Sequence, residues 1–126
     1  MSIFDHESAD WQDFQNLVAK LFSGLGCDVA VGRQLQLVCG KKEIGVYVRD
    51  PNTTPPSEYL CECKFWSKAI PQEVIHALRT VVSDYGAHRG FIISRAGFQA
   101  CGLEAVRNTN VNLVTLLLLK RFPCLN

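Results

Sequence analysis

A glutamate and a lysine stand two residues apart, Glu62 and Lys64, in the apolar and aromatic run Tyr59–Trp66. Successive residues of a strand alternate between its two faces, so both side chains are expected on the same face. A carboxylate beside an ammonium group at the end of a buried strand can hold a divalent cation and stabilise charge on a phosphate. The pair therefore indicates a site that cleaves phosphodiester bonds. The alternative is a surface ion pair, which stabilises a protein by under ~1 kcal/mol.

The composition is that of one globular domain. With 126 residues, of which 48% are hydrophobic, the whole chain 1–126 is expected to fold around a single core. The formal net charge is +1, so any surface for nucleic acid must be local. The six cysteines form no C-x-x-C pair and follow no signal peptide, which predicts reduced thiols and a cytoplasmic protein. The longest apolar stretch, Val111–Leu119, is too short to cross a membrane.

Hydrophobic spacing predicts an α/β fold with the element order α-β-β-β-β-α-β-α-β. The first half is typical of an antiparallel meander, with turns expected at Gly32-Arg33 and at Gly40-Lys41-Lys42. The second half alternates strand and helix, which requires parallel crossovers and gives a mixed sheet flanked by helices. The expected helices are residues 9–23, 71–85 and 98–108, and the expected strands are residues 27–31, 34–39, 43–49, 58–66, 91–94 and 111–117.

Four motifs follow one another along the chain. They are Trp11-x-x-Phe14 at the start of a helix, Ile44-Gly45-Val46-Tyr47-Val48, Cys61-Glu62-Cys63-Lys64-Phe65-Trp66, and Gly90-Phe91-Ile92-Ile93-Ser94-x-x-Gly97-Phe98-Gln99. An E-x-K tripeptide alone is weak evidence, but its position between a preceding strand and a following helix makes the match specific. In this order the motifs resemble the Mrr-type restriction endonuclease domain of the PD-(D/E)XK nuclease superfamily, and the resemblance covers nearly the whole chain.

The resemblance implies a role for each matching residue. Glu62 corresponds to the second acid of the family, a ligand of Mg²⁺ or Mn²⁺, and the carbonyl of Cys63 would be another ligand. Lys64 corresponds to the lysine that stabilises the transition state or positions the attacking water. The family's first acid is an aspartate, and this chain has Gly45 in its place. The first helix of the family often carries a glutamate after Trp-x-x-Phe, where this chain has Gln15.

Both departures remove negative charge from the implied metal site. Mg²⁺ is commonly held by one or two carboxylates together with water and substrate phosphate. A charge pair about 4 Å apart is worth roughly 4 kcal/mol at an effective dielectric constant near 20, and even half of that costs more than tenfold in metal affinity. Glu43 is the one nearby acid that could substitute, as a metal ligand and catalytic residue. It lies one same-face step from Gly45, about 6.7 Å along a strand; the alternative is a solvated residue at a strand end.

Five further residues are candidates for contact with DNA. His76 and Arg79 are alternatively solvated residues of a helix. Ser94 and Gln99 lie where the chain leaves a strand and enters a helix, a common place for sites in α/β sheets. The DNA-binding candidates are Lys68, His76, Arg79, Ser94 and Gln99.

Cys61 and Cys63 could be a pair of metal ligands. Because they alternate along a strand, both point to one face, which favours packing in the core over a metal pair.

Two functions follow from this sequence. The first is a DNA endonuclease domain, a hydrolase in which a divalent metal serves as Lewis acid, weakened by the missing acid at Gly45. The alternative is a catalytically inactive nuclease-fold module for DNA binding or partner assembly. In either case the expected partners are DNA and a homodimer or larger assembly that supplies specificity. A thiol enzyme or an oxidoreductase has little support, because the chain has no C-x-x-C pair and no glycine-rich dinucleotide loop.

Overall fold

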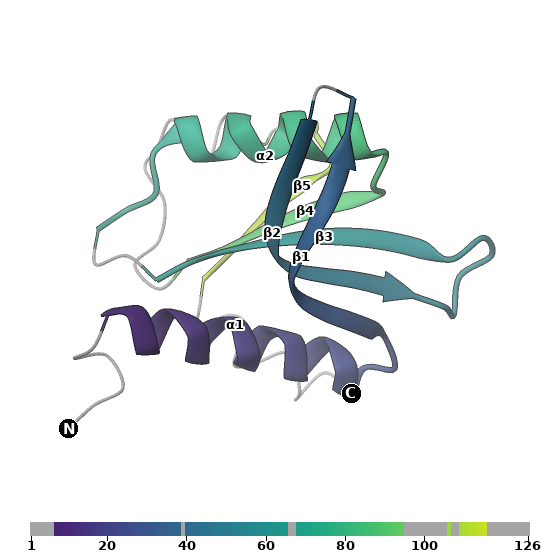
Figure 1. Ribbon diagram of the computed structural model, residues 1–126, viewed down its shortest axis with the longest axis horizontal. Coiled ribbons are helices and arrows are strands. Elements are labelled where there is room, and N and C mark those ends of the chain that lie inside the picture. The colour runs from purple at the N-terminus through teal and green to yellow at the C-terminus, as the bar shows by residue number, and fades with distance from the viewer. Residues whose placement is uncertain (1–6, 39, 66–67, 95–105, 107–108, 116–126) are drawn as a thin grey trace.

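The computed structural model describes residues 7–38, 40–65, 68–94, 106 and 109–115. These residues form two helices and five strands, arranged with the sheet between the helices (Figure 1). No helix in this part of the chain is long and apolar enough to cross a membrane. In chain order the elements are α1 (Glu7–Gly24), β1 (Asp28–Leu37), β2 (Gly40–Asp50), β3 (Ser57–Lys64), α2 (Gln72–Tyr85), β4 (Arg89–Ser94) and β5 (Val111–Thr115).

The five strands form one mixed sheet in the order β1-β2-β3-β4-β5. The pairs β1–β2 and β2–β3 are antiparallel, whereas β3–β4 and β4–β5 are parallel. Helix α2 connects the parallel strands β3 and β4, as a parallel pair requires. The predicted mixed sheet flanked by helices, with its antiparallel first half and parallel second half, is confirmed.

One detail of the predicted order is wrong, because the strands expected at 27–31 and 34–39 are a single strand, β1. Gly32 has a φ of +66°, yet Val31 and Arg33 on either side stay paired with β2. Glycine adopts a positive φ without a steric penalty, so the ladder can continue through it instead of turning. Three strands rather than four therefore precede α2, and the expected helix 98–108 lies outside the fully described residues.

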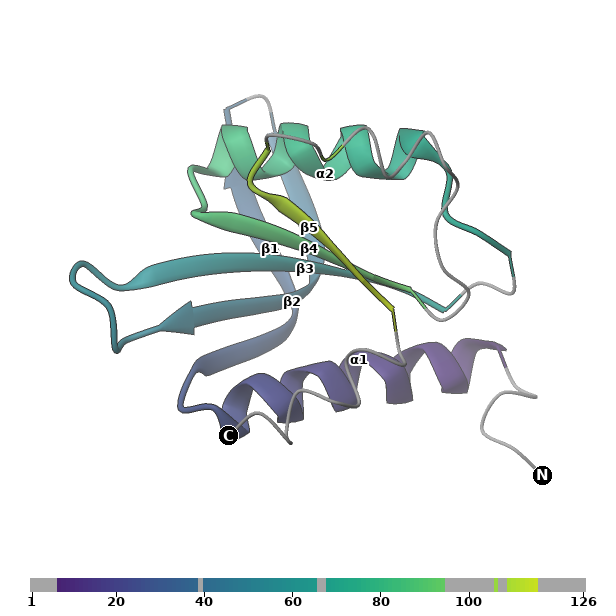
Figure 2. The same ribbon diagram turned by 180° about the vertical axis from the view of Figure 1, so that it is seen from behind.

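The helices cover opposite faces of the sheet (Figures 1 and 2). Each helix buries its apolar stripe in a separate cluster, so the sheet is a shared wall between two cores. The α1 side is made by Phe14, Val18, Ala19, Val46, Val48, Cys61, Cys63, Phe65, Ile93 and Val114. The α2 side is made by Leu35, Ile44, Tyr47, Leu60, Ile70, Ile75, Leu78, Val81, Val82, Ala87, Ile92 and Val111.

Helix α2 is fixed tightly against the sheet. It ends at Gly86, whose φ of 85° lies in the left-handed region and whose N–H donates to the carbonyl of Val82. Gly90 of β4 brings the sheet close to the helix: a Cβ at this position would lie 2.7 Å from Val82 Cγ2 and 3.1 Å from Leu78 Cδ2. This close approach fixes α2 against β4 at Leu78, a residue of the helix that faces Glu62 and Lys64.

Candidate active site

Glu62 and Lys64 lie together on the α2 side of β3, as the alternation of strand residues predicts. Lys64 Nζ is 3.9 Å from Glu62 Oε1. The side chain of Lys64 is 25% exposed and that of Glu62 is 19% exposed. Both are therefore partly withdrawn from water, although neither is fully buried. Partial burial strengthens the interaction of both charged groups with a bound anion or cation.

A cavity of about 240 Å³ opens beside this pair, and we call it the Glu62–Lys64 pocket. Helix α2 supplies one wall and β2 and β3 supply the other. Two carboxylates and two ammonium groups line it, so its formal charge is zero. The lining residues are Lys42, Glu62, Lys64 and Glu73, with Val74, Ala77, Leu78 and Val81.

Gly45 lies at the end of the β2–β3 ladder. Val46 pairs with Cys61 in the last pair of this ladder, so Gly45 is one residue beyond the pair that precedes Glu62 in β3. A Cβ at Gly45 would be 3.4 Å from the carbonyl oxygen of Cys61 and 3.4 Å from the amide of Gln15, both ordinary contact distances. The position therefore has room for a Cβ, and steric crowding at that atom does not require a glycine.

Gln15 of α1 is buried against this same position, with 5% of its surface exposed. In the amide orientation that satisfies both ends, Nε2 donates to the carbonyl of Gly45 at 3.2 Å and Oε1 accepts from the indole N–H of Trp11 at 3.3 Å. The two positions where this chain departs from the family motif are thus in direct contact. A neutral amide and a glycine meet where the family pattern implies two acids.

Glu43 does not line the Glu62–Lys64 pocket. It lines a second cavity of about 380 Å³ on the α1 side of β2, which we call the Trp11 pocket. Its carboxylate lies 4.0 Å from the position of a Cβ on Gly32. Lys42 and Glu43, adjacent in β2, thus serve different cavities. The Trp11 pocket is lined by Trp11, Gln12, Gln15, Asn16, Val31, Gly32 and Glu43.

The side chains present do not fit a metal site with two acids and a third ligand. Among the described residues, no group of three His, Cys, Asp or Glu side chains is placed to hold an ion. The thiol of Cys63 is buried on the α1 side, where burial raises its pKa, so the ligand that the resemblance implies at this residue stays its backbone carbonyl. Glu62 is left with Glu73 as the other carboxylate of the pocket, and Gly45 contributes no side chain.

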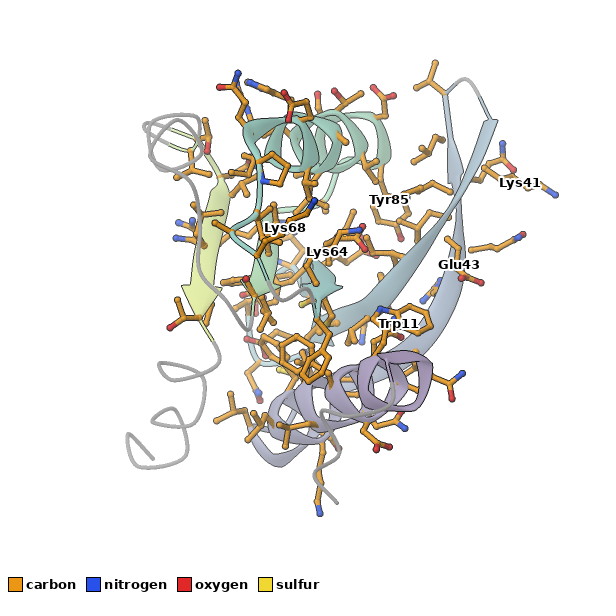
Figure 3. All side chains as sticks on the ribbon, turned by 90° about the vertical axis from the view of Figure 1, so that its left-hand side faces the viewer. Trp11, Lys41, Glu43, Lys64, Lys68 and Tyr85 are labelled. Atoms are coloured by element: carbon orange, nitrogen blue, oxygen red, sulfur yellow. The ribbon has the colours of Figure 1, made fainter. Side chains whose placement is uncertain are left out.

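The expected DNA-binding residues are only partly brought together. Ser94 is fully buried at the end of β4, where it pairs with Lys64. Lys68 is exposed and projects on the same side as Lys64 (Figure 3). His76 and Arg79 are exposed on α2 but do not line the pocket, because they fall on another side of the helix from Glu73 and Ala77. Gln99 lies outside the described residues.

A polar cluster on the α2 side was not foreseen from the sequence. Glu58 Oε2 accepts hydrogen bonds from the hydroxyls of Tyr47 and Tyr85, the latter at 2.7 Å. The guanidinium of Arg33 lies 4.0 Å from the centroid of the Tyr47 ring. The hydrogen bond from Tyr47 lowers the pKa of Glu58, while burial and the carboxylate raise the pKa of Tyr47 and Tyr85. These residues are far apart in sequence, and the strand register together with the packing of α2 on the sheet brings them together.

Comparisons with solved structures agree on the fold. The protein of unknown function AF1548 superposes with a TM-score of 0.71 at 17% identity, over 83% of this chain and 57% of its own. The DNA modification-dependent restriction endonuclease AspBHI gives 0.64 at 15% identity, over 87% of this chain and 30% of its own. The restriction endonuclease MspJI, in complex with a 27-mer oligonucleotide, superposes with a TM-score of 0.64 at 13% identity, over 95% of this chain and 29% of its own. The chain thus spans between about a third and somewhat over half of these proteins.

The family comparison gives the assignment. A search among curated proteins finds no match. The profile of the Mrr catalytic domain, described as restriction endonuclease, matches residues 6–122 and so covers nearly all of the chain, including both helices and all five strands. The same span contains Gln15, Gly45, Glu62 and Lys64. The chain belongs to the Mrr-type restriction endonuclease family, with the PD-(D/E)XK nuclease fold.

Proposed function

We propose that this chain acts as a single DNA-binding domain of the nuclease fold and that its metal-dependent hydrolysis of DNA is weak or absent. The observation that carries the proposal is the contact between Gln15 and Gly45. It puts a neutral amide and a glycine beside Glu62, where a metal-dependent nuclease needs carboxylates.

The basic residues around the Glu62–Lys64 pocket support DNA binding. Lys42 and Lys64 line the pocket, and Lys68 projects on the same side as Lys64. Lysine side chains of this kind bind phosphate groups and release condensed counterions from DNA. Because the whole chain has a net charge of +1, we expect modest affinity with a strong dependence on salt.

The remaining acid and lysine support a residual activity in the presence of Mg²⁺ or Mn²⁺. When bound, such an ion would supply Lewis-acid polarisation of the phosphate. Lys64 is placed to stabilise negative charge on a phosphate in the pocket, and Glu62 holds its ammonium group nearby. Glu43 lines the Trp11 pocket and not the Glu62–Lys64 pocket, which weakens the case for it as a substitute acid.

The alternative function is an inactive module that assembles with a partner. A dimer or larger complex would then supply sequence specificity, and the chain covers only 30% and 29% of the two restriction endonucleases to which it is similar in structure. A reducing cytoplasmic setting agrees with the free thiols of Cys27, Cys61 and Cys63. Light scattering and DNA binding measured on the same preparation separate this alternative from a monomeric DNA-binding domain.

The proposal is tested by titrating the chain with a labelled duplex in EDTA at several salt concentrations. Each lysine that contacts a phosphate contributes about 0.9 to the slope of log K against log salt. Lys64→Ala and Lys42→Ala are expected to lower both affinity and slope. Lys20→Ala, which removes an exposed lysine of α1 that lines neither cavity, is the matched control. Equal effects of all three variants would contradict a DNA surface at this pocket.

A further inference from the structure

We propose that the Trp11 pocket binds a nucleobase, taken from an unpaired nucleotide of the DNA that the domain engages. The pocket lies between α1 and the β1–β2 hairpin and has a volume of about 380 Å³, within the range of ligand sites. The inference rests on the proposed DNA binding and adds a second, base-directed site to it.

An exposed aromatic ring provides the stacking surface. Trp11 is 40% exposed, although its place in the amphipathic pattern predicts a packing residue. Its indole N–H is engaged by the buried amide of Gln15, so the ring is held at the mouth of the cavity instead of turning into the core. An oriented aromatic ring that keeps solvent-accessible surface is the kind of group on which single-stranded bases stack.

Polar groups that match the edge of a base surround this ring. Gln12 and Asn16 follow Trp11 on α1 and carry amides, which offer a donor and an acceptor together. Glu43 faces Trp11 across the cavity from β2 (Figure 3) and offers only acceptors. A carboxylate accepts from the exocyclic amino group of cytosine, so a base with an amino group is expected to be preferred over thymine.

The opposite wall leaves room for a flat ligand. Gly32 lines the pocket from β1, and its missing side chain keeps the space in front of Glu43 open. Val31 beside it is 47% exposed and provides an apolar contact. The lining thus combines an aromatic ring, an apolar side chain, amides and one carboxylate, which fits a nucleobase better than a phosphate.

The two cavities are neighbours along β2, because Lys42 lines the Glu62–Lys64 pocket and the next residue, Glu43, lines the Trp11 pocket. Gln15 also lines the Trp11 pocket, and it donates to the backbone of Gly45, which lies one residue beyond the Val46–Cys61 pair. A DNA strand whose phosphate contacts Lys42 is therefore expected to bring a neighbouring nucleotide to the Trp11 pocket. Taking a base out of a stacked duplex costs a few kcal/mol and least where the base is already unpaired, so the pocket favours bulged or single-stranded nucleotides.

The test measures affinity for three labelled duplexes that differ at one position: fully matched, carrying one bulged cytosine, and carrying one bulged abasic nucleotide. The native chain is expected to bind the cytosine bulge more tightly than the other two, by about 5- to 150-fold. Trp11→Ala should remove this difference and Trp11→Phe should retain most of it. Leu17→Ala, which removes another exposed apolar residue of α1 at 38% exposure, should leave it unchanged.

A second comparison separates base recognition from stacking alone. Glu43→Gln should abolish the preference for a bulged cytosine over a bulged thymine. The preference for a bulged base over a bulged abasic nucleotide should remain, because it depends on stacking against Trp11. Equal affinity for the cytosine and abasic bulges, or an equal loss for all three duplexes in Trp11→Ala, would overturn the base pocket while leaving DNA binding intact. A change of oligomeric state in Trp11→Ala with unchanged base discrimination would assign the pocket to a second copy of the chain instead. Absence of binding to every duplex would overturn the proposed function itself.

Discussion

Gln15 donates a hydrogen bond from its side-chain Nε2 to the carbonyl oxygen of Gly45, over 3.2 Å, and this contact joins α1 to β2 beside Glu62. A glutamate at position 15 could not make it, because a carboxylate has no proton to donate. The contact depends on the amide at position 15 and not on the glycine at position 45, because any residue at position 45 has the same backbone carbonyl. The contact explains how the fold stays well packed at a position where the family motif implies clustered negative charge.

Gln15→Glu is expected to destabilise the native chain in EDTA. The new carboxylate would be buried against the carbonyl of Gly45 and lose the donated bond, at a cost of about 1–3 kcal/mol. Urea unfolding at neutral pH measures this cost. Asn16→Asp, an exposed residue of the same helix with the same change of charge, is the control and should lose much less stability. An equal loss in the two variants would show that the Gln15 contact is not stabilising.

Gly90→Ala is expected to destabilise the fold by about 1–3 kcal/mol, because a Cβ there would lie 2.7 Å from Val82 Cγ2. Gly24→Ala is the matched control, since a Cβ at Gly24 meets nothing within 4 Å and the residue ends a helix. It should be neutral or stabilise the chain by up to about 1 kcal/mol. Thermal unfolding of both variants makes the comparison, and a neutral Gly90→Ala would mean that α2 is packed less closely than the structure shows.

The Glu58 cluster predicts a dependence of stability on pH. The pKa of Glu58 is lowered, first by the hydrogen bond from Tyr47, so its contribution is present above the unfolded pKa of about 4.3 and is lost as pH falls through the folded pKa. Glu58→Gln should therefore destabilise the chain at neutral pH, with a difference from native that shrinks in acid. Glu73→Gln, which changes an exposed glutamate of α2, is the control. A difference that stays constant between neutral and acid pH would contradict this role.

The helices and the position of the acid–lysine pair follow from local periodicity, which is why they could be predicted. The α2 stripe of Ile75, Leu78, Val81 and Val82 is buried. Glu62 and Lys64 share a face and a pocket, whereas Cys61 and Cys63 pack in the core on the other side. These features depend on residues close together in sequence and on the alternation of a single strand.

Features that depend on pairing between distant segments could not be obtained in this way. Lys42 and Glu43 face opposite sides by the alternation of β2, but which cavity each of them lines depends on where the β1–β2 hairpin passes between the helices. The cluster of Tyr47 with Glu58 exists because the register pairs Tyr47 with Leu60. The one local signal in this region is Gly32, which predicts a turn in the sequence analysis. In the structure it lies within the single strand β1 with a positive φ.

Gly45→Asp is expected to raise affinity for a divalent metal, because it restores a carboxylate at the position of the family's first acid, next to the Val46–Cys61 pair that precedes Glu62. About half of a close charge interaction, roughly 2 kcal/mol, corresponds to more than a tenfold gain. Calorimetric titration of Mn²⁺ into the chain without DNA measures the gain independently of catalysis. Gly45→Asn, which has the same size without the charge, should gain much less. Equal metal binding by the two variants would show that the position does not face the site.

Cleavage of supercoiled plasmid in Mg²⁺, by the native chain and by Gly45→Asp side by side, tests the central claim most directly. The account predicts that the native chain cleaves slowly or not at all and that Gly45→Asp cleaves at least about tenfold faster. Adding Glu62→Ala or Lys64→Ala to Gly45→Asp should abolish that gain. Rapid cleavage by the native chain that Glu43→Ala stops would contradict the account, because Glu43 would then have taken the place of the missing acid.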